Sequence, residues 1–433
     1  MTQVPVHHMF VNFDICPPLR APQSCFRYLF LMPDHSTRLS APTRPPQFGR
    51  HALDLWHLDP DIAFLNFGSF GAVPRCVLDL QKSWSERIER RPIEMLDRRL
   101  NELLLPAHDA ATRFVNGVDG HNAFMVNATA AINAVIRSMC FAPGDRLVAT
   151  THVYNAVRKT MEWVARRDGA EYVEFDVPLP AGGPEEFADS FVERLPARTR
   201  LLMLDHVSSP TGLIFPVERI LEAVSPLGID TIIDGAHAPG MLDINVSRLL
   251  DLGAIAWIGN MHKWAFAPKG CAMLQVHPSL RDRVQPNVIS HNADESFYER
   301  FLWQGTADFT SWLCLPESLA FGEEVFGWNA LREANHGLAV WAHDLLCSAW
   351  GVEPISPLDG SMIGSIASVP VPESVRGRFK DPESLMASLY DRYRIEVPVM
   401  LWNERWHLRV SAQAFNEPSE YEALADAVLE LGA

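Results

Sequence analysis

Short apolar runs alternate with amphipathic segments along the central part of the chain. The apolar runs predict strands at 123–126, 146–150, 201–204, 231–233, 254–258 and 271–276. Segments of helical period are expected at 74–115, 130–139, 155–167 and 216–226. Because strands that alternate with helices form a sheet with mostly parallel strands, the pattern predicts an α/β fold, with 271–276 as an antiparallel return strand.

The pattern changes after Pro316. A long helical stretch is expected at 317–350, followed by a strand at 363–367, a helix at 382–393, a strand at 406–411 and a last helix at 418–431. We interpret this part as a smaller α+β domain. The predicted organisation is therefore a large domain over 46–315 and a C-terminal small domain over 316–433.

The first 45 residues show neither helical nor strand period and are rich in proline. They lack the basic start and continuous apolar core of a secretory signal. We expect a poorly ordered N-terminal segment over 1–45. An alternative is that translation starts at Met32, in which case residues 1–31 are not part of the protein.

Composition narrows the class of partner. The 433 residues carry a formal net charge of −16, which argues against a nucleic-acid or anionic-membrane surface but not against a local basic pocket for the phosphate of a small molecule. No run of eighteen apolar residues occurs, so no membrane span is expected. The 7 cysteines contain no Cys-x-x-Cys pair, which indicates reduced thiols in a cytoplasmic protein and suggests no metal site.

Two polar residues follow neighbouring apolar runs. Asp234 ends the run 231–233, and Lys263 comes shortly after the run 254–258. Parallel strands that end side by side place their following residues where open α/β sheets bind ligands. A lysine that can form a Schiff base, beside a carboxylate that can keep a pyridinium nitrogen protonated, indicates pyridoxal 5′-phosphate (PLP) as the cofactor.

The segment Asn127-Ala128-Thr129 lies between a predicted strand and a predicted helix. A helix N-terminus offers unpaired N–H groups to an anion, and Thr129 adds a hydroxyl. The alternative is an ordinary N-cap. Beside the Asp and Lys at strand ends, phosphate binding by Ala128 and Thr129 is the better interpretation, with Asn260 and His262 as further donors.

Two more side chains are candidates for the cofactor ring. His237, three residues after Asp234, can reach the phenolic oxygen of the ring, or it can be a structural histidine near a turn. Tyr154 follows another strand and can stack on the ring, or it can be a core aromatic residue. The sequence leaves both pairs of alternatives open.

Arg409 alternates with apolar residues on the strand 406–411, so it points to one face of a sheet. A buried arginine needs an anion, either the carboxylate of an amino-acid substrate or the partner in an internal salt bridge. Gly305-Thr306 can present backbone and hydroxyl donors, but the same pair is also typical of a simple turn.

Taken together, the motifs of this chain resemble the class V aminotransferase-fold PLP enzymes of fold type I, in particular the isopenicillin N epimerase-like branch. The resemblance covers about residues 60–430. It rests on the presence and order of these segments along the chain: Leu65-Asn66-Phe67-Gly68-Ser69-Phe70-Gly71, Asn127-Ala128-Thr129, 205–212, Asp234-Gly235-Ala236-His237, 259–264, Gly305-Thr306 and Arg409-Val410-Ser411.

The resemblance implies a role for each candidate. Lys263 would carry the Schiff base and move the α-proton, and Asp234 would pair with the ring nitrogen. His237 would bond the phenolic oxygen, and Tyr154 would stack on the ring. The phosphate would be held by Ala128, Thr129, Asn260 and His262, and in a homodimer by Thr306 of the neighbouring subunit. Arg409 would bind the substrate carboxylate.

The expected activity is epimerisation at the α-carbon of an amino acid. The alternatives are a C–S lyase acting on a cysteine derivative or sulfoxide, and an aminotransferase. A non-catalytic PLP-binding protein is disfavoured because the Lys and the Asp are both present. The segment 394–400, interpreted as the loop that carries a reactive cysteine in cysteine desulfurases, contains no Cys here, which argues against a persulfide mechanism.

Overall fold

The computed structural model describes residues 41–433. The predictions for the N-terminal segment therefore lie almost wholly outside the described residues. The described chain falls within a single compact unit, so the division at 315 into two domains stays a prediction.

The largest sheet has seven strands in the order β2-β8-β7-β6-β5-β3-β4. Strands β3 to β7 pair in parallel, whereas β8 runs antiparallel to both β7 and β2. The mostly parallel α/β sheet and the antiparallel return strand are confirmed. The strands are β2 (Asn122–Met125), β3 (Arg146–Thr150), β4 (Glu171–Phe175), β5 (Thr199–Asp205), β6 (Asp230–Asp234), β7 (Ala254–Asn260) and β8 (Ala272–Val276).

Successive residues of the central strands point to opposite faces of the sheet, and different helices pack on each face. On β5, Leu201 and Met203 join the core formed with α4 (Ala128–Arg137) and α5 (Asn155–Asp168). Leu202 and Leu204 join the core that includes α6 (Pro184–Arg194), α7 (Val217–Val224) and α8 (Val246–Asp251). Burial on both faces explains why the strands read as continuous apolar runs.

The expected helix at 74–115 is divided into α2 (Arg75–Arg90), a π-helical turn at Glu94–Arg98 and α3 (Leu100–Phe114). The break follows from Pro92, because the residue before a proline is disfavoured in helical conformation. The shorter elements are η1 (Arg50–Leu55), α1 (Phe67–Phe70), η3 (Ser225–Leu227), α9 (Pro278–Arg281), α10 (Phe297–Leu302), α11 (Thr310–Leu313), α12 (Leu315–Phe321), η4 (Gly322–Phe326) and α14 (Glu373–Arg376).

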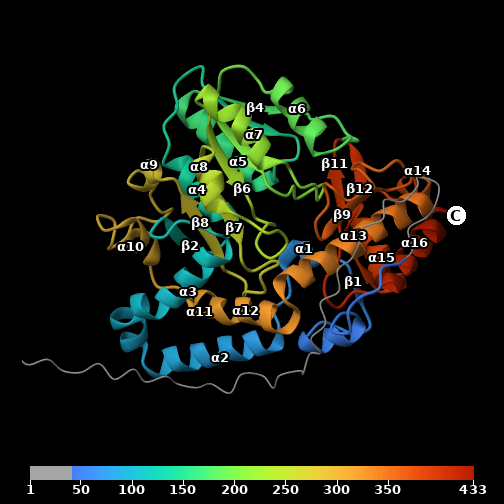
Figure 1. Ribbon diagram of the computed structural model, residues 1–433, viewed down its shortest axis with the longest axis horizontal. Coiled ribbons are helices and arrows are strands. Elements are labelled where there is room, and N and C mark those ends of the chain that lie inside the picture. Colours follow the sequence, from blue (N-terminus) through green and yellow to red (C-terminus); the bar gives the residue numbers. More distant parts are fainter. Residues whose placement is uncertain (1–40) are drawn as a thin grey trace, which may run out of the picture. The chain divides into compact units, whose positions relative to one another are not determined.

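The C-terminal part contains a three-stranded antiparallel sheet in the order β11-β12-β9. Three helices pack with it around a second apolar core, shown in orange to red in Figure 1. The expected helix at 317–350 is interrupted at Gly327, whose φ of 73° ends the preceding turn. The elements are α13 (Trp328–Trp350), β9 (Ile366–Pro370), α15 (Pro382–Tyr393), β11 (Val399–Trp402), β12 (Arg405–Ser411) and α16 (Pro418–Gly432).

The interpretation of 394–400 as a loop is wrong. This segment contains β10 (Ile395–Glu396) and the start of β11. The two-residue strand β10 forms because it pairs in parallel with β1 (Ala63–Phe64), from the other end of the described chain. Such a short strand has no periodic signal of its own.

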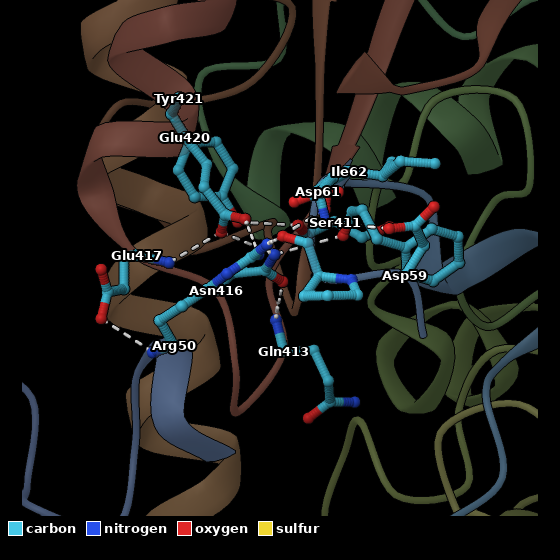
Figure 2. A network of polar contacts seen from close by, with 12 residues as sticks. Arg50, Asp59, Asp61, Ile62, Ser411, Gln413, Asn416, Glu417, Glu420 and Tyr421 are labelled. Carbon is cyan, nitrogen blue, oxygen red and sulfur yellow. Dashed lines mark hydrogen bonds and ion pairs between the residues drawn. The ribbon is translucent and has the colours of Figure 1, made fainter. Parts of the chain in front are cut away.

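A polar network fixes η1 to the start of α16 (Figure 2). Glu420 Oε1 lies 2.7 Å from Arg50 Nη1, and Glu420 Oε2 accepts from Asn416 Nδ2 at 3.0 Å and from the Glu417 N–H at 2.9 Å. The Arg50 N–H donates to Glu417 Oε1 at 2.7 Å. We call these four residues the Glu420 network. Both oxygens of its central carboxylate are bonded.

Over residues 41–433, none of the helices combines the length and the apolar character that crossing a membrane requires.

Candidate active site

The carboxyl ends of the central parallel strands bring the predicted residues together. Strand β6 ends at Asp234, and β7 ends at Asn260, three residues before Lys263. The two strands are parallel neighbours, with Asp234 paired to Ile258. The Asp and the Lys therefore leave adjacent strands at one edge of the sheet, where α/β sheets bind ligands.

Lys263 is a half-buried residue whose amine has no acidic partner. Its Nζ lies 3.1 Å from His237 Nε2, and no ion pair joins it to a carboxylate among residues 41–433. Burial, assisted by the positive charge of Arg409 and opposed by the negative charge of Asp234, lowers the pKa of Lys263 to about 7. A large fraction of the amine is thus neutral, and nucleophilic, near physiological pH.

His237 is held as a neutral imidazole. Burial first, and then the charges of Lys263 and Arg409, lower its pKa well below the ordinary value. If Nε2 accepts from Lys263, the proton lies on Nδ1, which is buried without a hydrogen-bond partner. A buried donor without a partner supports a role for His237 in binding a ligand oxygen, and argues against a purely structural role.

The Asp234 carboxylate is only partly satisfied by the chain. Its Oδ1 accepts from the Ala236 N–H at 3.0 Å. Burial raises its pKa, while that bond and the charge of Lys263 oppose the shift. Asp205, at the end of β5 and paired with Asp234, had no predicted role; burial and the charge of Asp234 raise its pKa well above the ordinary value.

The start of α4 lies against the end of β7. The Ala128 N–H donates to Asn260 Oδ1 at 2.8 Å, which orients the amide of Asn260. Asn127 is the N-cap, because its side chain accepts from the Ala130 N–H, so this alternative is also realised. Within residues 41–433, the N–H and the hydroxyl of Thr129 donate to no other residue, and they stay available to an anion.

His262 is held by a backbone carbonyl group. Its Nδ1 lies 2.8 Å from the carbonyl oxygen of Cys271 and therefore carries the proton. Burial lowers the pKa of His262 to about 4, so Nε2 of the neutral ring is an acceptor. Donation to a phosphate by His262 requires a second proton on the ring.

Arg409 is only 3% exposed, and its guanidinium contacts serines instead of acids. Nη1 donates to the carbonyl oxygen of Ser209, and Nη2 donates to Ser69 Oγ at 3.2 Å. Its Nε is buried without a partner. The alternative of an internal salt bridge is not observed among the described residues, and burial lowers the pKa of Arg409 to about 10. Asp234, His237, Lys263 and Arg409 form what we call the Lys263 cluster.

Sequence reasoning missed the serines that hold Arg409. Ser69 and Ser209 both lie in segments that carry the resemblance, yet their contacts span 340 and 200 positions of the chain. No local pattern shows such a contact. Gly71 belongs to the same segment as Ser69: at φ 67°, a Cβ there would lie 2.5 Å from the carbonyl oxygen of His262. Only glycine lets this segment pack on the backbone beside Lys263.

Two predicted residues are exposed. Tyr154 precedes α5 and is 47% exposed, so it is not a core aromatic residue. Thr306 is exposed in the loop between α10 and α11. No hydrogen bond joins Thr306 to the Lys263 cluster within residues 41–433.

These residues fit PLP. The cluster offers an amine with a pKa of about 7, a free imidazole donor and a carboxylate, and the start of α4 offers donors for a phosphate. An unpartnered guanidinium nitrogen remains for a second anion. The chemical types match the aldehyde, phenolic oxygen, ring nitrogen and phosphate of this cofactor.

Known proteins show the same family. The family model described as Aminotransferase class-V matches residues 72–397. Isopenicillin N epimerase of Streptomyces clavuligerus is 32% identical over 86% of this chain and 95% of its own. A probable chloroplastic L-cysteine desulfhydrase of Arabidopsis thaliana is 28% identical over 86% of this chain and 83% of its own.

Solved structures agree on the fold. The cysteine desulfurase of Thermococcus onnurineus superposes with a TM-score of 0.74 at 18% identity, over 90% of this chain and 99% of that chain. A C-DES variant with glycine covalently linked to its PLP cofactor has a TM-score of 0.73 at 17% identity, with the same coverage. The chain belongs to the class-V aminotransferase family of PLP-dependent enzymes.

Proposed function

We propose that this enzyme abstracts and returns the α-proton of an amino acid, as an epimerase. The observation that carries the proposal is the Lys263 cluster, in which a neutral lysine amine shares a buried site with an arginine that has no acidic partner. An α-amino acid brings the groups that this site lacks, namely a carboxylate for the arginine and an acidic proton for the lysine.

The residues of the chain divide this work. Arg409 binds and orients the carboxylate, since its planar fork matches that group and its neighbours here are neutral serines. Lys263, once released by the substrate amine, takes the α-proton, and its pKa of about 7 suits a general base. Asp234 holds the proton of the ring nitrogen. When bound, PLP supplies the electron sink that makes the α-proton acidic.

A C–S lyase acting on a cysteine derivative or sulfoxide is the second candidate. It is favoured by the L-cysteine desulfhydrases among the relatives, which align over most of this chain. The same cluster would serve its first proton transfer, and the two reactions differ in whether a β-substituent leaves. An aminotransferase uses the same step and returns the proton to the cofactor.

One incubation separates these outcomes. The enzyme is mixed in D₂O with a panel of L-amino acids, D-amino acids and cysteine sulfoxides, and α-deuterium, chirality and pyruvate are followed together. We expect deuterium exchange with inversion. Pyruvate released from a cysteine sulfoxide without inversion would assign the lyase. Formation of the keto acid that keeps the substrate's own side chain would assign the aminotransferase. No exchange with any substrate would contradict the proposal.

We further propose that the active enzyme is a homodimer in which Thr306 serves the phosphate of the neighbouring site. The proposal is supported by the exposure of Thr306, which makes no hydrogen bond to the Lys263 cluster of its own subunit within residues 41–433. Lys263→Ala and Thr306→Trp subunits, each inactive alone, should regain part of the activity when mixed. A fully active enzyme that is a monomer by analytical sedimentation would contradict the shared site.

A further inference from the structure

The buried guanidinium of Arg409 is linked to a distant carboxylate by a chain of hydrogen bonds. Arg409 Nη2 donates to Ser69 Oγ at 3.2 Å, Ser69 Oγ donates to Asn66 Oδ1 at 2.5 Å, and Asn66 Nδ2 donates to Glu396 Oε1 at 3.2 Å. Each donor in this chain points away from Arg409. The bonds are therefore aligned from a cation at one end to an anion at the other, an arrangement in which each bond polarises the next.

The direction of the chain is set by Glu396. A carboxylate accepts but does not donate, so it requires the amide nitrogen of Asn66 to face it. The side-chain carbonyl of Asn66 then faces Ser69 and accepts a hydrogen bond from its hydroxyl. A lone pair of Ser69 Oγ is left for Arg409; with the amide reversed, Asn66 would donate to Ser69 and turn the hydroxyl proton toward the cation.

The position of Asn66 supports a role beyond local structure. Asn66 is the N-cap residue of α1, where its side chain would ordinarily accept from a backbone N–H of the first turn. Here its side chain makes no capping bond, and its side-chain carbonyl accepts from the Ser69 hydroxyl instead. Its partner Glu396 is on β10, which pairs with β1 just before Asn66.

The geometry points to Asn66, Ser69 and Glu396 as positioning residues that hold Arg409 ready for the α-carboxylate of the substrate, an inference that rests on the proposed function. Without this chain the guanidinium would be held only through Nη1, by Ser209, because no acid contacts it among residues 41–433. A guanidinium held by neutral oxygens keeps its full charge for an incoming carboxylate, whereas a direct ion pair would compete with it.

The test uses L-alanine and L-alaninamide, which share the amine and differ in the α-carboxylate. Their affinities for the PLP-loaded enzyme are measured by absorbance titration, which needs no turnover. The ratio of the affinity for L-alanine to the affinity for L-alaninamide reports the carboxylate contact. We expect Ser69→Ala to reduce the ratio about 10-fold, since a hydrogen bond to a charged group is lost. The affinity for L-alaninamide should stay within about 2-fold.

Glu396 separates orientation from simple support. Glu396→Gln keeps an acceptor for Asn66 and should leave the ratio within about 2-fold of wild type, whereas Glu396→Met keeps the volume without an acceptor and should lower it about 3-fold or more. Glu373→Met, at an exposed position, is the control. Cofactor absorbance and the thermal midpoint verify that each variant is folded.

The outcomes distinguish two failures. If wild type prefers L-alanine, Arg409→Ala removes the preference, and the Ser69, Asn66 and Glu396 variants keep it, the positioning inference is overturned while the proposed function stands. If wild type shows no preference for the carboxylate, the role of Arg409 in the proposed function is overturned, and the inference with it. Lower stability with an unchanged ratio in Glu396→Met would reduce Glu396 to a structural tie between α1 and β10.

Discussion

The Glu420 network and the Lys263 cluster are both polar groups that contain buried side chains, but they are bonded in opposite ways. In the network, the central carboxylate bonds an arginine, an amide and a backbone N–H, so the chain itself satisfies it (Figure 2). In the cluster, His237 Nδ1 and Arg409 Nε have no partner within residues 41–433, and Lys263 has no acid.

This difference separates residues that hold the fold from residues that act on a ligand. An unsatisfied buried polar group costs free energy, so its presence calls for an explanation outside the folded chain. Enzymes accept such costs at their active sites. Substitutions in the network should therefore lower stability and spare the chemistry, and substitutions in the cluster should do the reverse.

The largest effect is expected for Lys263→Met. All turnover should be lost, because both the covalent attachment of PLP and the proton transfer use this amine. The thermal midpoint of the apoprotein should stay the same or rise, because a desolvated amine is replaced by an apolar side chain of similar length. A midpoint several degrees below that of the wild-type apoprotein would break the contrast between the two regions.

Asp234→Ala should come next. A carboxylate paired with a ring nitrogen in a dry site contributes up to several kcal/mol. Because about 2.7 kcal/mol corresponds to 100-fold in rate, turnover should fall by about 100-fold. Some PLP should remain bound through the phosphate donors of α4. Near-normal turnover measured with the PLP-saturated variant would show that Asp234 does not serve the ring.

Arg409→Lys is expected to raise KM for amino acids by about 10-fold to 100-fold, because an ammonium cannot reproduce the planar fork. The absorbance of bound PLP should be unchanged. The alternative, a structural arginine, predicts a lowered thermal midpoint with KM close to normal. Both quantities are measured on the same preparation, and that second pattern would exclude carboxylate binding.

Glu420→Gln tests the other region. One amide oxygen can replace a carboxylate oxygen, but the amide nitrogen would face another donor, and the ion pair with Arg50 would be lost. We expect a loss of roughly 3 kcal/mol in the free energy of unfolding, at the low end for a buried pair because Arg50 is 35% exposed. The PLP-loaded enzyme that remains folded should keep its kcat and KM; altered kinetics without lost stability would contradict the comparison.

The last prediction concerns the dependence of stability on pH. The pKa of Lys263 is about 7 in the folded protein, against 10.5 for an ordinary lysine. Between these values the unfolded chain binds more protons, so this residue makes the apoprotein more stable as pH rises through the window. The stability of wild type relative to Lys263→Met, measured by denaturant titration, should therefore rise from pH 7 to pH 10; a flat difference would show that Lys263 is not perturbed.

The sequence predicts the site residues at the strand ends well. It predicts poorly which other residues bond to the side chains of the site. Asp234 and Lys263 are visible because each follows an apolar run long enough to be recognised as a buried strand. Ser69 and Ser209 are not visible as partners of Arg409, because three segments far apart in the chain must first meet. The protonation of His262 depends on one carbonyl group, that of Cys271, which no motif indicates.

The central claim is that Lys263 holds the cofactor. The PLP-loaded enzyme is reduced with borohydride, digested and mapped by mass spectrometry. The account predicts a single reduced phosphopyridoxyl label on Lys263, absent from Lys263→Met, with the neighbouring Lys269 unmodified. A label on Lys269 or on any other lysine of the wild-type enzyme would contradict it.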